Sequence, residues 1–386
     1  MAEPHAAPSP SSSGLGGRLT ILEVGLASSL GTHAIGACAA ARAGIVRPSP
    51  LPGRIALDPV TEKSEPLIGH PVSFLTRGFS GPGRVARLGG LALGDLLSRA
   101  ALRPEDMSQT AVVLALGSGY HRNAAELIAD AKAFTDELPP DAPEVAVTKE
   151  GVRTLAVARM FEMAGLPAPA VVELVFDDHA GFGQALHRAS MLLADRRVRR
   201  CLVGGIDSYC DPETLDVLDE LALVKGPGNP VGIPPGEGAA FVLLERSDAS
   251  STPTRRFEIA NAAYLSGSSH LLSPTGLGGR KLAEAVGNAL EAAAGTPCGL
   301  SIGTHNGANW CAVEWGETAL ALPEWSKTGR HWWHAISFGD TGAAAPAIAT
   351  CMATQALTRG YAEGPKVLVW ASGPTGSKTA FVVTSR

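Results

Sequence analysis

The stretch AVVELVFDDHAGFGQALHRASMLLADRRVRRCLVGGIDS, residues 170–208, contains a strand, a sharp turn, a helix and a second strand. Residues 170–176 form an apolar, β-branched run of strand length. Residues 180–195 carry apolar side chains at helical spacing, and residues 201–203 form a second apolar run that ends in two glycines. Two strands joined by a helix are typical of a parallel sheet that is covered by helices.

The same alternation continues on both sides of this unit. Further strands are predicted at residues 19–24, 111–116, 237–245, 257–263, 299–302, 366–371 and 379–384. Further helices are predicted at residues 32–42, 84–103, 152–164, 278–293 and 343–357. Because the second half of the chain repeats the order of the first, the sequence predicts an α/β fold with two pseudo-repeated halves and mainly parallel sheets.

The boundaries of these halves follow from composition. Residues 247–256 are polar and contain proline, so they are predicted to link a first half at residues 18–246 to a second half at residues 257–386. Residues 1–17 are rich in Ala, Pro, Ser and Gly and lack the basic and apolar regions of a signal peptide. We expect them to form a disordered tail.

Composition excludes several function classes. The formal net charge of −5 gives no electrostatic reason to expect a nucleic-acid partner, and the apolar runs are too short to span a membrane. The six cysteines form no C-x-x-C pair, which favours reduced thiols in a cytoplasmic protein.

No cofactor or metal site is predicted. The run HWWH at residues 331–334 has no third ligand at a suitable spacing, so we do not expect it to bind a metal. Residues 373–379, GPTGSKT, are similar to a phosphate-binding loop but have Ser where that loop needs Gly before the Lys. No helix follows them to receive a phosphate.

Several segments resemble the β-ketoacyl synthase family, which has the thiolase-like fold. They occur in the family's order and are ILEVGLASSLG (21–31), LVGGIDS (202–208), NPVGIPPGEGAA (229–240), GDTGAA (339–344) and GPTGS (373–377). The resemblance implies a five-layered α/β/α/β/α fold and a dimer formed along a sheet edge.

The resemblance also implies an active site, and this chain departs from it. Condensing members of the family use a Cys at the turn before a helix, whose N-terminus stabilises the thiolate. The family's spacing before Gly204 leads to His179, and residues 105–200 contain no Cys. Neutral His is a poor acyl carrier because an acyl-imidazole hydrolyses readily. The neighbouring Asp177 and Asp178 suit the N-cap of a helix and would disfavour a thiolate.

The remaining family positions are altered as well. His305 corresponds to the first of two family His residues, and Glu314 corresponds to the acidic residue on the following helix. Asp340 stands in place of the second His, and residues 335–336 stand where the family has a Lys. Decarboxylative condensation is therefore not expected, and His179, His305 and Asp340 are the candidate site residues.

Each candidate has two interpretations. His179 is either a ligand-contacting base or a capping or core histidine. Asp340 either pairs with His305 as base and orienter for hydrolysis or supplies negative charge at the N-terminus of the helix from residue 343. All six Trp lie between Trp310 and Trp370 and are predicted to be core or dimer contacts, although some could fill the family's acyl tunnel.

Three functions follow from the resemblance. We favour a non-condensing partner in fatty-acid or polyketide biosynthesis, which would dimerise with an active ketosynthase and shape its acyl cavity, as chain-length-factor subunits do. The alternatives are an acyl-thioester transferase or hydrolase that uses His179, His305 and Asp340, and a module that binds an acyl chain or acyl-carrier protein without chemistry. The chain would form a homodimer or such a heterodimer, and an open tunnel to His179 would favour one of the alternatives.

Overall fold

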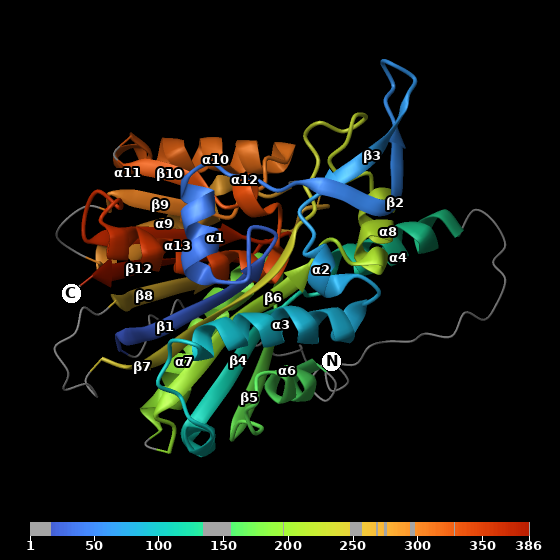
Figure 1. Cartoon of the computed structure of the whole chain (residues 1–386). Coiled ribbons are helices and arrows are strands. Elements are labelled where there is room, and N and C mark those ends of the chain that lie inside the picture. Colours follow the sequence, from blue (N-terminus) through green and yellow to red (C-terminus); the bar gives the residue numbers. More distant parts are fainter. Residues whose placement is uncertain are drawn as a thin grey trace, which may run out of the picture.

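The computed structural model describes residues 17–133, 156–195, 197–247, 257–267, 269–273, 276–293, 298–327 and 329–385 (Figure 1). The predicted tail and the predicted linker lie almost entirely outside the described residues. The first residues of the helix that we predict from residue 152 also lie outside them.

Ten strands form one sheet in the order β10-β9-β11-β12-β8-β1-β7-β6-β4-β5. The first half contributes β1 (Leu19–Ser28), β4 (Thr110–Leu116), β5 (Val171–Phe176), β6 (Arg200–Ser208) and β7 (Glu237–Arg246). The second half contributes β8 (Phe257–Leu265), β9 (Leu300–Gly303), β10 (Arg330–Trp333), β11 (Lys366–Ser372) and β12 (Lys378–Ser385). The first half has the spatial order β1-β7-β6-β4-β5, and the second half has the order β8-β12-β11-β9-β10. If the five strands of each half are numbered along the chain, both orders are 1-5-4-2-3, so the topology is duplicated.

The two half-sheets are continuous only at one short pairing. Residues 19–21 of β1 pair with residues 257–259 of β8 in antiparallel register. Beyond this pairing the halves separate and enclose a layer of helices, with the second half above the first in Figure 1.

The sheet is mixed, so the prediction of mainly parallel sheets is wrong. β4 runs parallel to β5 and β6, and β9 runs parallel to β10 and β11. β7 is antiparallel to β1 and β6, and β12 is antiparallel to β8 and β11. β11 and β12 are joined by the turn at residues 373–377, which is too short for the crossover that a parallel pair requires.

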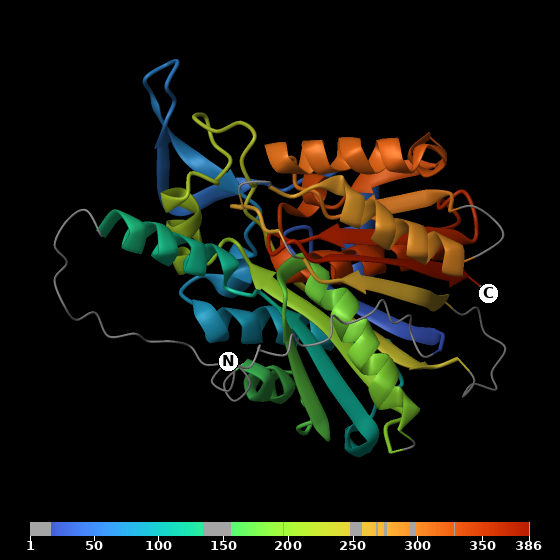
Figure 2. The same cartoon turned by 180° about the vertical axis from the view of Figure 1, so that it is seen from behind.

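Helices complete five layers, as the resemblance implied. The helices α3 (Gly81–Leu97) and α6 (Ala158–Met163) pack on the outside of the first half, and α9 (Gly279–Ala292) covers the second half with α10 (Asn309–Ala321) beside it. The helices α7 (Gly181–Ala194) and α13 (Ala345–Arg359) lie between the halves. α7 contacts β4 and β6 of one half and β8 and β12 of the other (Figure 2).

Sequence reasoning did not predict several elements that border the cavities. They include α4 (Tyr120–Ala133), α8 (Pro212–Glu220), α10, β10 and the hairpin of β2 (Ser49–Leu57) and β3 (Ser64–Gly69). The hairpin projects from the body of the molecule in Figure 1.

The shorter elements are α1 (Ala34–Arg42), α2 (Ser73–Thr76), α11 (Pro323–Lys327), α12 (Ala335–Phe338), η1 (Pro104–Gln109), η3 (Asp178–Ala180) and η4 (Gly342–Ala344).

The core between the halves depends on small side chains. Twelve residues of α13 are buried, and its sequence APAIATCMATQALTR contains five alanines. A helix that is apolar on all sides is suited to a position between two sheets. One hydrophobic cluster contains residues of both half-sheets, α7 and α13, so the halves share a single core.

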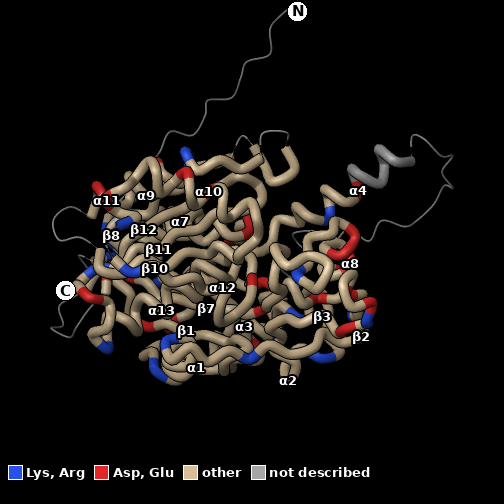
Figure 3. Tube along the Cα trace, turned by 90° about the horizontal axis from the view of Figure 1, so that it is seen from above, with Lys and Arg blue, Asp and Glu red and all other residues tan. Residues whose placement is uncertain are grey.

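The surface carries charges of both signs. In Figure 3 acidic and basic residues alternate around the outline of the molecule. Within the described part of the chain, no helix is long and apolar enough to cross a membrane. The same residues contain no group of three or more His, Cys, Asp or Glu side chains arranged to hold a metal ion.

Candidate functional site

The candidate site forms where the two central helices begin. The turn η3 leads from β5 into α7, and the turn η4 leads from the loop after β10 into α13. These are equivalent connections in the duplicated topology, because each joins the third strand of its half to the fourth. The site brings the two turns together, with Nε2 of His179 lying 2.7 Å from Oδ1 of Asp340.

Asp340 is bonded at both carboxylate oxygens. The backbone N–H of Gly342 donates to Oδ1 at 2.9 Å, and Nδ2 of Asn306 donates to Oδ2 at 2.6 Å. The side chains of His179 and Asp340 are only 3% and 1% exposed. The carboxylate therefore has three protein donors and little contact with solvent.

The electrostatics favour an ion pair. Burial alone would lower the pKa of His179, but the Asp340 carboxylate outweighs it and raises this pKa above the ordinary 6.5. Burial alone would raise the pKa of Asp340, but the imidazolium of His179 and the donors from Asn306 and Gly342 hold this pKa far below its usual range. Both shifts favour the charged forms, so the contact is arranged as an ion pair.

The residues before His179 are held by side chains of other elements. Asp178 has φ +43°, a left-handed conformation that is uncommon outside glycine, and its carboxylate accepts bonds from the backbone N–H and the hydroxyl of Ser118. Asp177 accepts bonds from Tyr264 and Thr375, both at 2.9 Å. Neither Asp caps the helix as the sequence suggested, because their carboxylates bond to these partners instead.

His305 belongs to a different buried cluster. Its Nε2 lies 2.8 Å from Oε2 of Glu314, whose Oε1 lies 2.5 Å from Nζ of Lys378. Lys378 also donates to the hydroxyl of Ser372 at 2.6 Å. The hypothesised pairing of His305 with Asp340 is not formed, because His305 bonds to Glu314 and the next residue, Asn306, bonds to Asp340.

Sequence reasoning missed Lys378, which is 1% exposed. We sought a Lys shortly before Asp340, whereas the buried one comes from β12 at the end of the chain. Its only sequence signal is a charged residue at the start of an otherwise apolar strand, and such residues are usually exposed.

The Trp residues around this cluster pack against one another and against His305, and Trp315 and Trp333 also line a cavity. The ring of His305 stacks on Trp333 at an interplanar angle of 7° and meets Trp370 edge-on with centroids 4.7 Å apart. Trp315 stacks on Trp370, and both lie against the second half-sheet with α9. They hold His305 in a fixed orientation.

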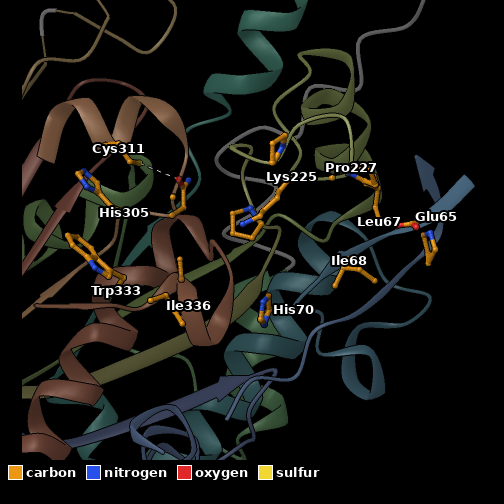
Figure 4. A pocket seen from close by; sticks show the side chains of 18 of the residues that line it. Glu65, Leu67, Ile68, His70, Lys225, Pro227, His305, Cys311, Trp333 and Ile336 are labelled. Atoms are coloured by element: carbon orange, nitrogen blue, oxygen red, sulfur yellow. Dashed lines mark hydrogen bonds between the residues drawn. The ribbon is translucent and has the colours of Figure 1, made fainter. Parts of the chain in front are cut away.

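A cavity of about 790 Å³ lies beside this cluster (Figure 4). Its walls come from the β2–β3 hairpin, the loop at residues 225–234 and the residues from His305 to Trp315. Cys311, inside the cavity, donates from Sγ to Oδ1 of Asn306 at 3.3 Å. His179 is not a lining residue of this cavity, whereas Asn306 is, and Nδ2 of Asn306 donates to Asp340.

No known family model matches this sequence, and none of the curated proteins does either. Solved structures do match over nearly the whole chain. The type II polyketide ketosynthase AntDE, in complex with its acyl-carrier protein AntF, has a TM-score of 0.70 at 14% identity, covering 95% of this chain and 99% of that chain. The chain has the ketosynthase fold.

Two further ketosynthase structures agree. A β-ketoacyl synthase from Burkholderia phymatum has a TM-score of 0.65 at 17% identity, covering 96% of this chain and 100% of that chain. The ketosynthase ApeO in complex with its chain length factor ApeC, from Xenorhabdus doucetiae, has a TM-score of 0.66 at 17% identity, covering 95% and 98%.

One motif of this ketosynthase-fold chain has a clear structural role. Glu237, in the segment PPGEGAA, is fully buried. Its carboxylate accepts bonds from the backbone N–H of Val72 at 2.6 Å, from Nε of Arg84 at 2.6 Å and from the hydroxyls of Thr76 and Ser208 at 2.7 Å. The motif thus joins α2, α3 and β6 to β7.

Proposed function

We propose that this chain is a non-condensing partner subunit of fatty-acid or polyketide type biosynthesis, which pairs with an active ketosynthase and shapes its acyl cavity. The observation that carries the proposal is the buried ion pair between His179 and Asp340. It occupies the strand-to-helix turn at which a condensing enzyme of this fold would hold its Cys.

The ion pair supports a role without covalent catalysis. A general base needs an unprotonated nitrogen that can reach a substrate proton. Nε2 of His179 is bonded to Asp340, and the raised pKa of His179 favours the protonated ring. The walls of the 790 Å³ cavity also exclude His179. These features give no support to a transferase or hydrolase that uses His179 as its base.

The outermost strand supports pairing with another chain. β5 is at one end of the sheet, so one of its backbone edges faces away from the sheet. Its side chains Val172 and Leu174 are only half-buried. An edge strand of this kind is a template for pairing with a second chain. The neighbouring complexes, a ketosynthase with its chain length factor and a ketosynthase with its carrier protein, support a ketosynthase and a carrier protein as partners.

Co-expression tests the pairing. The tagged chain is produced with a Cys-containing ketosynthase from the same genome, and the purified material is measured by light scattering after size exclusion. We expect a one-to-one heterodimer that Val172→Lys on β5 prevents, and because Val172 also packs against the core of the first half, the thermal transition of the variant is measured to show that it is folded. Val313→Lys makes the same change at an exposed position of α10 and should leave the heterodimer intact. A strict homodimer with no affinity for any such ketosynthase would contradict the proposal.

An activity measurement separates the proposal from its main alternative. Acyl-thioesters incubated with the isolated chain should release free thiol no faster than in buffer. In the heterodimer, the chain should alter the length of the partner's products. Turnover by the isolated wild type that His179→Gln abolishes would favour the hydrolase or transferase instead.

A further inference from the structure

A second cavity, of about 270 Å³, lies in the first half of the molecule. It is bounded by the carboxyl ends of β4 and β6 and by the first turns of α3, α4 and α8. Its volume is that of about nine water molecules at the density of the liquid. The carboxyl ends of strands in α/β sheets are common positions for small ligands.

Two buried polar groups in this cavity have no partner. Tyr209 and His121 are 3% and 7% exposed, and neither the hydroxyl of Tyr209 nor Nε2 of His121 forms a hydrogen bond with any described residue. Their rings meet edge-on with centroids 5.7 Å apart and do not bond to each other. A buried polar group without a hydrogen-bond partner loses its interaction with water and gains none in return, which is unfavourable. Two such groups in one cavity therefore indicate a ligand that bonds to both.

The cavity also contains carboxylates that no cation neutralises. Asp178 is 3% exposed and accepts bonds from Ser118, and Asp207 accepts bonds from the backbone N–H groups of Ser208 and Ala343. Neither of them forms an ion pair with a described residue. Burial raises the pKa of Asp207 to about 7, and the neighbouring Asp178 adds to this rise.

The cations near the cavity are already used. Arg84 and Arg122 line it, but Arg84 pairs with Glu237 and Arg122 pairs with Glu213. The imidazolium of His179 is close enough to interact with Asp178 and Asp207, yet its charge is matched by Asp340. The described cations around the cavity are therefore each paired with another carboxylate, whereas Asp178 and Asp207 are not in an ion pair.

The remaining walls are aromatic. Tyr120, Phe176 and Tyr209 line the cavity together with His121, and aromatic faces attract cations. Burial lowers the pKa of His121, so its ring is neutral and one ring nitrogen is an acceptor. Asp178, Asp207, the Tyr209 oxygen and this ring nitrogen together offer several acceptors, which matches a group with three N–H donors.

We propose that this cavity binds a small primary alkylammonium ion, whose ammonium group lies between Asp178, Asp207, Tyr209 and His121 and whose alkyl chain lies against Tyr120 and Phe176. All the residues that line this cavity belong to this one chain, so binding of the alkylammonium ion does not require a partner ketosynthase.

Calorimetric titration of the full chain with n-propylammonium chloride tests the proposal. The matched neutral probe is n-propanol, and tetramethylammonium tests whether the three N–H donors matter. We expect saturable binding of propylammonium, at least tenfold weaker binding of tetramethylammonium and no measurable binding of propanol. Equal binding of propanol, or no saturable propylammonium binding at tens of millimolar, would overturn the proposal.

Two variants test the position of the site. Tyr209→Phe removes only an unpartnered hydroxyl, so it should leave the melting temperature unchanged or raised and weaken propylammonium binding at least fivefold. Asp178→Asn keeps a residue type that tolerates a left-handed backbone and should weaken binding at least tenfold. Tyr361→Phe and Asp58→Asn make the same changes far from the cavity and should bind as the wild type does. If both cavity variants are folded and bind propylammonium normally, the site is wrong.

Discussion

At the scale of single residues, the ion pair between His179 and Asp340 has a defined pH dependence. His179 has a raised pKa in the folded state, so its contribution to stability is complete below the ordinary value of 6.5 and is lost as the pH rises through the folded pKa. Asp340 has a lowered pKa, so its contribution is present above its ordinary value of 3.8 and is lost as the pH falls further. The pair should stabilise the fold most between these two ordinary values.

The variant His179→Gln tests this dependence. We expect the difference in unfolding free energy between wild type and variant to be largest near pH 5 and to decrease as the pH rises through the folded pKa of His179, because the imidazolium then loses its proton. Urea unfolding across this range measures the difference. His33→Gln, at a histidine whose side chain is 71% exposed, is the control and should show a smaller change. A difference that is constant with pH would contradict the ion-pair assignment.

Lys378 and Glu314 should show strong coupling. Lys378→Met leaves the buried carboxylate of Glu314 with His305 alone, and removing one partner of a buried ion pair costs about 3–5 kcal/mol. The double variant Lys378→Met with Glu314→Gln removes both charges and should lose less stability than the two single changes added together. A double-mutant cycle by urea unfolding measures the coupling, and strict additivity would show that the two side chains do not interact.

At the scale of elements, the close approach of β6 to η4 requires glycine. A Cβ on Gly205 would lie 2.5 Å from the carbonyl oxygen of Ala343, which is backbone and cannot rotate away. Gly205→Ala should therefore destabilise the protein by about 1–3 kcal/mol or more. Gly94→Ala is the matched control, since its Cβ would meet open space on α3, and it should be neutral or stabilising by up to about 1 kcal/mol. Urea unfolding of both variants checks the prediction, and equal stabilities would contradict it.

The strands could be predicted from sequence better than the helix ends and the small elements. Runs such as residues 110–116 are buried on every residue, so their apolar composition alone indicates a strand. The helix predicted to reach Arg103 ends at Leu97, because Pro104 opens a separate turn. Apolar periodicity did not indicate the helix α10, because its buried positions are few and include Glu314 and Thr318; only the resemblance placed Glu314 on a helix.

At the scale of the whole molecule, the two halves should not fold independently. The helices α7 and α13 are covered by both half-sheets, and the main hydrophobic cluster draws on both. We expect chains 1–250 and 251–386, produced separately, to lack near-ultraviolet circular dichroism and a cooperative thermal transition. When co-expressed, they should co-purify and recover both, because each covers the exposed core of the other. A cooperative transition in either chain alone would contradict a single shared core.

The sequence by itself determined the repeated order of strands and helices, the absence of a Cys from residues 105–200 and the position of His179 at a strand-to-helix turn. These are local properties, because periodicity, turn residues and the identity of a side chain do not depend on distant contacts. Only the tertiary structure decided that His179 meets Asp340 and that His305 meets Glu314 and Lys378. His179 and Asp340 are 161 residues apart in the chain, and they meet because the duplicated topology brings the starts of two helices to the centre of the molecule. A pattern within a short stretch of sequence cannot indicate a contact between residues so far apart.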